Sequence, residues 1–197
     1  MALIDQLLKQ LSGAPAAQIG SQLGLDQSAV NKAITTALPV ILGGLAKNAQ
    51  SSEGASALTS ALDRDHDGSI LDDLVGFATQ ASSGGIGDGI LGHVFGSNRS
   101  KAENAVGTSS AISGGQAAKL MAMLAPIVMG YLGKKKRESN LDASQMATEL
   151  QAESERHGPQ ESSLVSMVSK MLDSDGDGSV MDDVLKIGGS LLSRWNS

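Results

Sequence analysis

The sequence LMAMLAPIVMGYLG, residues Leu120–Gly133, is the longest apolar stretch of the chain. It falls short of the roughly 18 uninterrupted apolar residues that mark a membrane-spanning helix, so we expect a buried core helix and no transmembrane segment. A related pattern occurs upstream, where ALPVILGGLAK at Ala37–Lys47 aligns with LAPIVMGYLGK at Leu124–Lys134. Proline, glycine, leucine and lysine recur at matching positions with an offset of 87 residues. This repetition predicts two related halves, each built on one of these helices.

The composition favours close-packed helices over sheets. Hydrophobic residues make up 41% of the 197 residues but aromatic residues only 2%, so the core must consist of Leu, Ile, Val, Ala and Met. Apolar spacing indicates an amphipathic helix over 2–11, and a polar helix is expected over 141–156. We expect an all-α helical bundle with a first half over 1–83, a Gly-rich connector over 84–110 and a second half over 111–197, able to pack as one domain.

Two acidic stretches share one pattern, DRDHDGSILDD at Asp63–Asp73 and DSDGDGSVMDD at Asp173–Asp183. Seven of their eleven positions are identical, and two of the other four exchange one aliphatic side chain for another. They hold ten of the 21 acidic residues; the remaining 11 face 15 basic residues, although the whole chain has a net charge of −6. Such crowding of like charge is destabilising unless a cation or an opposed charge lies nearby.

The spacing within each acidic stretch is typical of a calcium-binding loop. Carboxylates stand at positions 1, 3 and 5, a glycine at position 6 supplies the bend, and position 7 offers its backbone carbonyl. Position 12, where an EF-hand has Glu, is apolar (Leu74 and Val184), so the Asp at position 10 or at position 11 must close each loop. The expected ligands of two calcium ions are Asp63, Asp65, Asp67, Ser69, Asp72 and Asp73 in the first loop, and Asp173, Asp175, Asp177, Ser179, Asp182 and Asp183 in the second.

Helices are expected on both sides of each acidic stretch, giving a helix–acidic loop–helix unit in each half. The flanking segments of the second stretch are 162–172 and 181–195. Magnesium prefers a water-rich octahedral shell, so calcium is the better fit to a carboxylate-dense loop. The alternative without metal is a pair of surface turns whose aspartates cap helices.

Residues 16–38 have the apolar pattern of a helix-turn-helix, with Gly24 at the turn and Asp26 as the expected N-cap of the second helix. A DNA-reading helix needs basic and amide side chains. The second helix offers Gln27, Ser28, Asn31 and a single lysine, Lys32. With the acidic net charge, this disfavours nucleic acid as a partner, and an ordinary helical corner is the preferred interpretation.

Other motifs give no indication of an enzyme. Gly87, Gly89 and Gly92 follow a G-x-G-x-x-G order, but no predicted strand precedes them, as dinucleotide binding would require. The three histidines are scattered, and no Ser/His/Asp grouping is evident. KKKR at 134–137 follows an apolar helix, where cations complement the helix dipole; the alternative is a patch for a membrane surface or an acidic partner. We expect no catalytic site and identify no small-molecule substrate.

The cysteine content and the N-terminal segment bear on the compartment. The chain has no cysteine, and its N-terminal segment lacks a basic region and includes Asp5 and Gln6, unlike an ordinary signal peptide. A cytoplasmic location is therefore expected, with export by another route left open. Gly- and Ala-rich apolar helices such as Leu120–Gly133 could equally pack in a homo-oligomer or against another protein.

Four stretches resemble the bacterial domain-of-unknown-function family 937: LPVILGGLAKNAQSSEGASAL, DRDHDGSILDDLVG, GGIGDGILGHVFG and LMAMLAPIVMGYLG. The likeness covers most of 23–132, and it implies a helical bacterial protein of undetermined activity. The acidic loops separately resemble EF-hand and dockerin calcium loops, apart from the apolar position 12. We expect a calcium-binding, non-enzymatic helical protein in which calcium stabilises the structure or an interaction surface.

Overall fold

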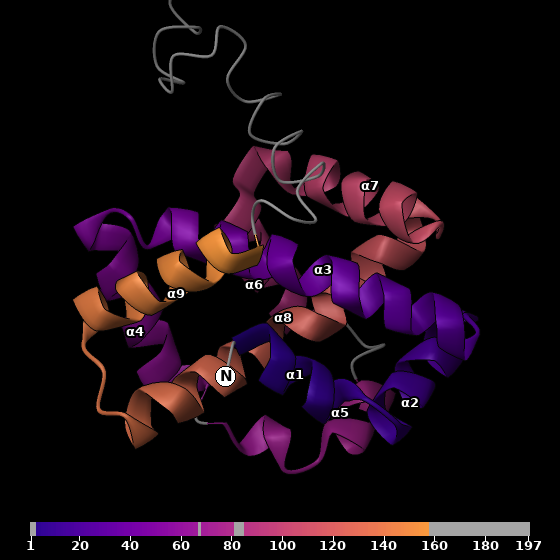
Figure 1. Cartoon of the computed structure of the whole chain (residues 1–197), viewed down its shortest axis with the longest axis horizontal. Coiled ribbons are helices and arrows are strands. Elements are labelled where there is room, and N and C mark those ends of the chain that lie inside the picture. The colour runs from indigo at the N-terminus through magenta and orange to yellow at the C-terminus, as the bar shows by residue number, and fades with distance from the viewer. Residues whose placement is uncertain (1–2, 67, 81–84, 158–197) are drawn as a thin grey trace, which may run out of the picture.

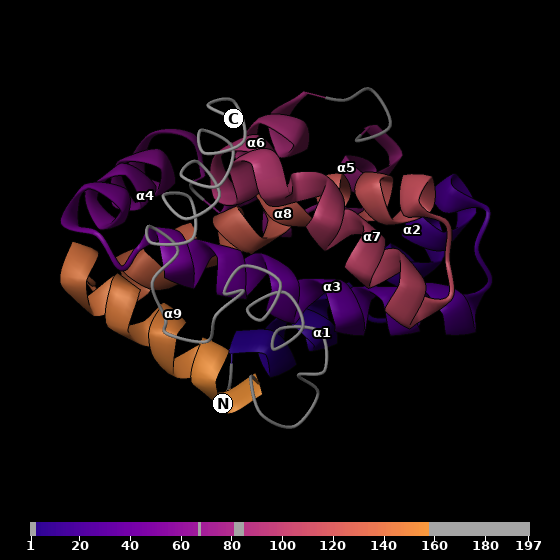
Figure 2. The ribbon, with the colours of Figure 1, turned by 90° about the horizontal axis from the view of Figure 1, so that it is seen from above.

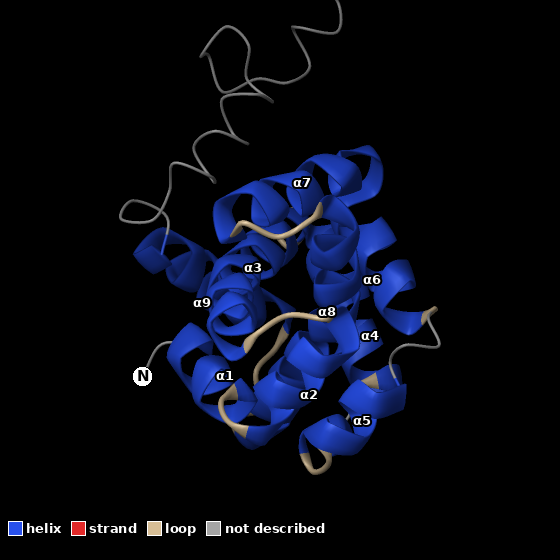
Figure 3. Cartoon of the chain, turned by 90° about the vertical axis from the view of Figure 1, so that its right-hand side faces the viewer, coloured by secondary structure: helices blue, strands red, loops and turns tan. Residues whose placement is uncertain are grey.

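The computed structural model describes residues 3–66, 68–80 and 85–157 (Figure 1). Within these ranges the regular structure is entirely helical (Figure 3), which confirms the predicted all-α class. The elements are α1 Leu3–Leu11, α2 Ala14–Leu23, α3 Gln27–Asn48, α4 Ser52–Asp65, η1 Ser69–Leu71, α5 Leu74–Gln80, α6 Ile86–Phe95, η3 Gly96–Asn98, α7 Arg99–Ser110, α8 Gly114–Glu138 and α9 Ala143–His157.

The two apolar stretches form α3 and α8, the longest helices of the described chain, and these pack against each other in the middle of the fold. Helix α8 is buried on nearly every side between Leu120 and Gly133. Helices α6 and α7 cover α8, while α9 and α7 pack on α3. Figure 3 shows the other helices arranged around this pair. The core is aliphatic, as the composition predicts.

Local signals set the helix ends. Asp26 caps α3 as predicted, because its side chain accepts a hydrogen bond from the Ala29 amide at 2.8 Å. Gly24 ends α2 with φ 65°, a left-handed conformation that favours glycine. Ser113 and Gln116 form a reciprocal capping box at the start of α8.

The segment 84–110 differs from the expected connector, since most of it folds into α6 and α7. The glycines serve helix packing there. A Cβ on Gly87 would overlap the backbone carbonyl of Ala122 in α8, so only glycine permits this close approach. Leu91 and Val106 are fully buried against the core.

Helix α9 lies along α3 and beside α4 at one end of the molecule (Figure 2). It also fixes the first helix, because the buried Glu153 carboxylate accepts the Ile4 amide at 2.9 Å. The second acidic stretch and its expected flanking helices, 162–172 and 181–195, lie outside the described residues.

By length and composition alone, α3 and α8 could each cross a membrane. In this fold, 50% of the apolar window of α3 and 72% of that of α8 are buried inside the protein. Buried core helices of soluble proteins satisfy the same criterion.

Candidate metal centre

The first acidic stretch joins α4 to α5 around a sharp bend. Helix α4 continues to Asp65, and Gly68 then adopts φ 84°, the left-handed conformation expected at the bend glycine of a calcium loop. The short helix η1 follows, with the Leu71 amide donating to the Gly68 carbonyl at 3.0 Å. The backbone is therefore helix, bend, helix.

The candidate ligands of this loop occupy different positions around the bend. Asp63 is exposed on the last turn of α4, and Asp72 is exposed after η1. Asp73 caps α5, because its Oδ1 accepts the Gly76 amide at 2.7 Å. Ser69 is exposed in η1, Asp65 is the last residue of α4, and Asp67, the central carboxylate, lies outside the described residues. Among the described side chains, no three acidic, histidine or cysteine groups gather at a metal-binding distance.

A basic segment faces this loop. Lys136 of α8 donates to Asp63 Oδ1 at 2.6 Å, and its side chain is only 17% exposed. A Cβ built on Gly68 would lie 2.9 Å from Lys134 Cβ and 3.6 Å from Arg137 Nη2. The end of α8 thus lies beside the acidic loop, and Lys136 supplies an opposed charge to Asp63, whereas Lys135 pairs with Glu149 of α9.

Two glycines of α8 let the loop approach closely. A Cβ on Gly130 would overlap the side chain of Ile70, and a Cβ on Gly133 would overlap the carbonyl oxygen of His66. A small cavity of about 90 Å³ remains under the loop, lined in part by Phe77 and Pro126. The loop backbone therefore rests directly on the α8 backbone.

The sequence analysis missed the pairing of Lys136 with Asp63, which lie 73 residues apart. The sequence does contain two clusters of opposite charge, KKKR and the acidic stretch, that could have suggested this ion pair. Only the packing of η1 and α4 against α8 brings them together.

Residues 16–38, which have the apolar pattern of a helix-turn-helix, form a turn between α2 and α3. The Leu25 amide donates to the Gly20 carbonyl at 2.8 Å across the bend. Gln27, Asn31 and Lys32 are exposed on α3, and Gln27 donates to Asn31 at 3.0 Å. One lysine on this face provides little attraction for a phosphate backbone.

The G-x-G-x-x-G glycines and Tyr131 all lie inside helices. Gly87, Gly89 and Gly92 all lie inside α6, so they do not form a phosphate-binding turn. Burial raises the pKa of Tyr131, with a smaller contribution from nearby acids led by Glu153. The Tyr131 hydroxyl donates to Gln6.

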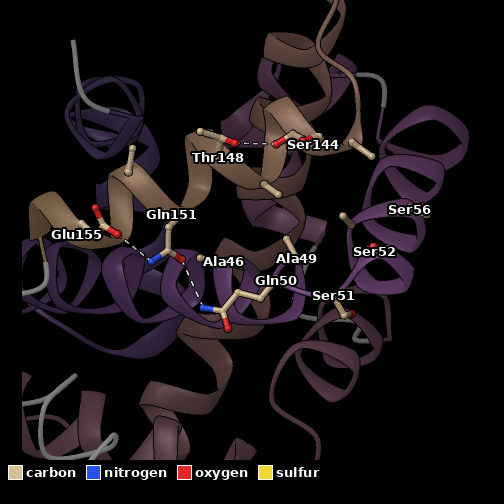
Figure 4. A pocket seen from close by; sticks show the side chains of 14 residues that line it. Ala46, Ala49, Gln50, Ser51, Ser52, Ser56, Ser144, Thr148, Gln151 and Glu155 are labelled. Atoms are coloured by element: carbon tan, nitrogen blue, oxygen red, sulfur yellow. Dashed lines mark hydrogen bonds between the residues drawn. The ribbon is translucent and has the colours of Figure 1, made fainter. Parts of the chain in front are cut away.

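A second feature is an open groove of about 700 Å³ between the end of α3, the start of α4 and α9 (Figure 4). Alanine, serine, threonine and glutamine side chains line it, and Glu155 is its one charged side chain among the described residues. Gln50 donates to Gln151 across it at 3.4 Å.

A sequence model of a bacterial protein family of unknown function, DUF937, matches residues 5–135. The matched region contains α3, most of α8 and the first acidic stretch, but not the second. No curated protein and no solved structure matches the chain.

Proposed function

Because the chain belongs to the bacterial family of unknown function DUF937, whose description gives no activity, we propose its function from its own residues. It is a non-enzymatic, calcium-binding helical protein. Two related halves each carry one helix–acidic loop–helix unit, and each loop binds one calcium ion that stabilises the structure or an interaction surface.

The left-handed backbone conformation of Gly68 is the main observation that supports this proposal. A calcium loop needs a sharp turn at its sixth position so that oxygen ligands before and after the turn reach one centre. Gly68 occupies that position and has φ 84°. The second stretch has carboxylates and a glycine at the same positions. A surface turn without a ligand would not need this pattern to be repeated.

The surroundings favour Asp72 as the ligand that closes the first loop. One oxygen of Asp73 already accepts the Gly76 amide and holds the start of α5. Asp72 is exposed; its backbone amide donates to the Ser69 carbonyl at 3.1 Å, but its carboxylate accepts no hydrogen bond from the described residues. The donors are hard oxygens, the class that calcium prefers.

Lys136 is the protein's own cation at this loop. Its ammonium group neutralises Asp63 when calcium is absent, and calcium must displace it to use that carboxylate. We therefore expect the first loop to bind calcium more weakly than its carboxylate count alone would indicate.

Calcium titration by calorimetry, followed by thermal melting, tests the proposal. Calcium at millimolar concentration should bind near two ions per chain and raise the Tm, and magnesium should do so less. Asp67→Asn and Asp177→Asn should each remove one site. Asp5→Asn, an exposed change outside both loops, is the matched control. Binding that is absent, or that Asp5→Asn weakens equally, contradicts the proposal.

Nucleic-acid binding through residues 16–38 is the alternative function. Gly24 forms a turn between two helices, as this motif requires, but Lys32 is the one basic side chain on the exposed face of α3 over residues 27–38, which follow the turn. A gel-shift assay on bulk DNA separates the two. Binding that Lys32→Glu removes and Lys119→Glu preserves would favour this alternative.

A further inference from the structure

The groove between α3, α4 and α9 is lined by short side chains. Ala46, Ala49 and Ala55 in its lining are buried, and Ala147 of α9 also lines it. Figure 4 shows Ala46 and Ala49 beside Gln50. Side chains this short leave room for another backbone to come close, since interhelical distance depends on the side chains at the contact.

A small-molecule ligand fits this groove less well. Sites for such ligands are lined mainly by hydrophobic and aromatic side chains with a few convergent polar groups. This groove has no aromatic residue among its described lining, and its polar side chains are serines, a threonine, two glutamines and Glu155, all exposed except the partly buried Gln151.

The chain itself supplies a suitable occupant. It continues for 40 residues after His157, where α9 ends, and Gln151 and Glu155 of α9 line the groove just before that point. Residues 162–172 follow a connector that contains Pro159, a residue that does not continue a helix. We propose that residues 162–172 form a helix that packs into this groove, antiparallel to α9.

The dimensions agree. Eleven helical residues extend about 16 Å, and the groove follows α9 from Ala143 to Glu155, about 18 Å at 1.5 Å per residue. A connector of four residues is typical between antiparallel helices. Leu164, Val168 and Met171 fall on one face at helical spacing.

The internal repeat supports the same placement independently. At the 110-residue offset of the acidic stretches, 162–172 corresponds to 52–62 of α4. The buried Leu58 and Leu62 of α4 then correspond to Val168 and Leu172.

The receiving surface repeats as well. Helix α4 packs against α8, where a Cβ on Gly133 would lie 3.5 Å from the Leu62 carbonyl oxygen. The residue of α3 that aligns with Gly133 is Ala46, which lines the groove. The docking does not depend on calcium, so this inference and the proposed function stand or fall separately.

Cross-linking in the full chain tests the placement, because the sequence has no cysteine of its own. Thr148→Cys with Val168→Cys should form a disulfide within one molecule on mild oxidation. Thr35→Cys with Val168→Cys is the matched control. Thr35 and Thr148 are both exposed helical threonines that donate to the carbonyl four residues earlier, at 2.9 Å in each case, and only Thr148 lines the groove.

Monomeric cross-linked product at least fivefold above the control supports the proposal. Equal yields overturn it. Cross-linked dimers would mean that the segment occupies the groove of a second copy, which also overturns the intramolecular placement.

Hydrogen exchange gives a readout that needs no cysteine. The amides of 162–172 should be protected in the unmodified chain, and Thr148→Trp should reduce that protection at least tenfold while Thr35→Trp leaves it unchanged. Fast exchange of 162–172 in the unmodified chain, or equal effects of the two tryptophans, overturns the proposal.

Discussion

Replacing Gly133 by alanine tests how closely the acidic loop lies against α8. Most glycine-to-alanine changes inside a helix are stabilising, by about 1 kcal/mol, because alanine has the better helix propensity. At Gly133 the added Cβ would overlap the carbonyl oxygen of His66. The obstacle is backbone rather than the end of a flexible side chain, so either the loop or α8 must move.

The magnitude follows from these opposing terms. Overpacking a tightly packed site costs about 1–3 kcal/mol, and a backbone obstacle places Gly133 at the upper end. After the propensity gain, we expect Gly133→Ala to lower the free energy of unfolding by about 2 kcal/mol. For a protein of this size that corresponds to a Tm decrease of about 4–8 °C.

Gly92→Ala is the matched control, since Gly92 lies inside α6 and a Cβ there meets no atom within 4 Å. That change should raise stability by about 0.5–1 kcal/mol. Urea unfolding followed by circular dichroism measures both variants. Equal stabilisation by the two alanines would refute close packing of the loop on α8.

Three further outcomes are expected. Lys136→Met should tighten calcium binding at the first loop by up to about fivefold in calorimetry, since an ion pair whose carboxylate is half exposed contributes up to about 1 kcal/mol; an unchanged affinity would show that Lys136 does not compete. Ser110→Ala should leave urea stability unchanged or raise it by about 1 kcal/mol, because the buried Ser110 hydroxyl has no hydrogen-bond partner among the described residues. Tyr131 has a raised pKa, so its contribution to stability is present below about pH 10 and is lost as the pH rises through the folded pKa. Alkaline melting should therefore show a steeper loss of stability for the native chain than for Tyr131→Phe, and parallel curves would contradict this.

The helices that could be predicted from the sequence are those with a one-sided or continuous apolar pattern. The core helices α3 and α8, the first helix and the Asp26 cap all follow from residues close together in the chain. These features depend on residues that are close together in the chain, so they can be predicted from a single sequence.

Glycine was the main source of error. Between 84 and 110 it indicated a connector, because glycine weakens an isolated helix. Its actual use at Gly87 is to admit the backbone of Ala122, a contact that no local pattern reveals. The ion pair of Lys136 with Asp63 was hidden for the same reason, since it exists only once α4 and α8 have packed.

The separation of α3 and α8 along the chain has a consequence for synthesis. The C-terminal end of α8 follows that of α3 by 90 residues, which take roughly 5–18 s to translate at typical rates. During that interval the apolar surface of α3 has no α8 to cover it. The nascent chain must therefore carry this apolar helix for several seconds before α8, one of its packing partners in the core, has been made.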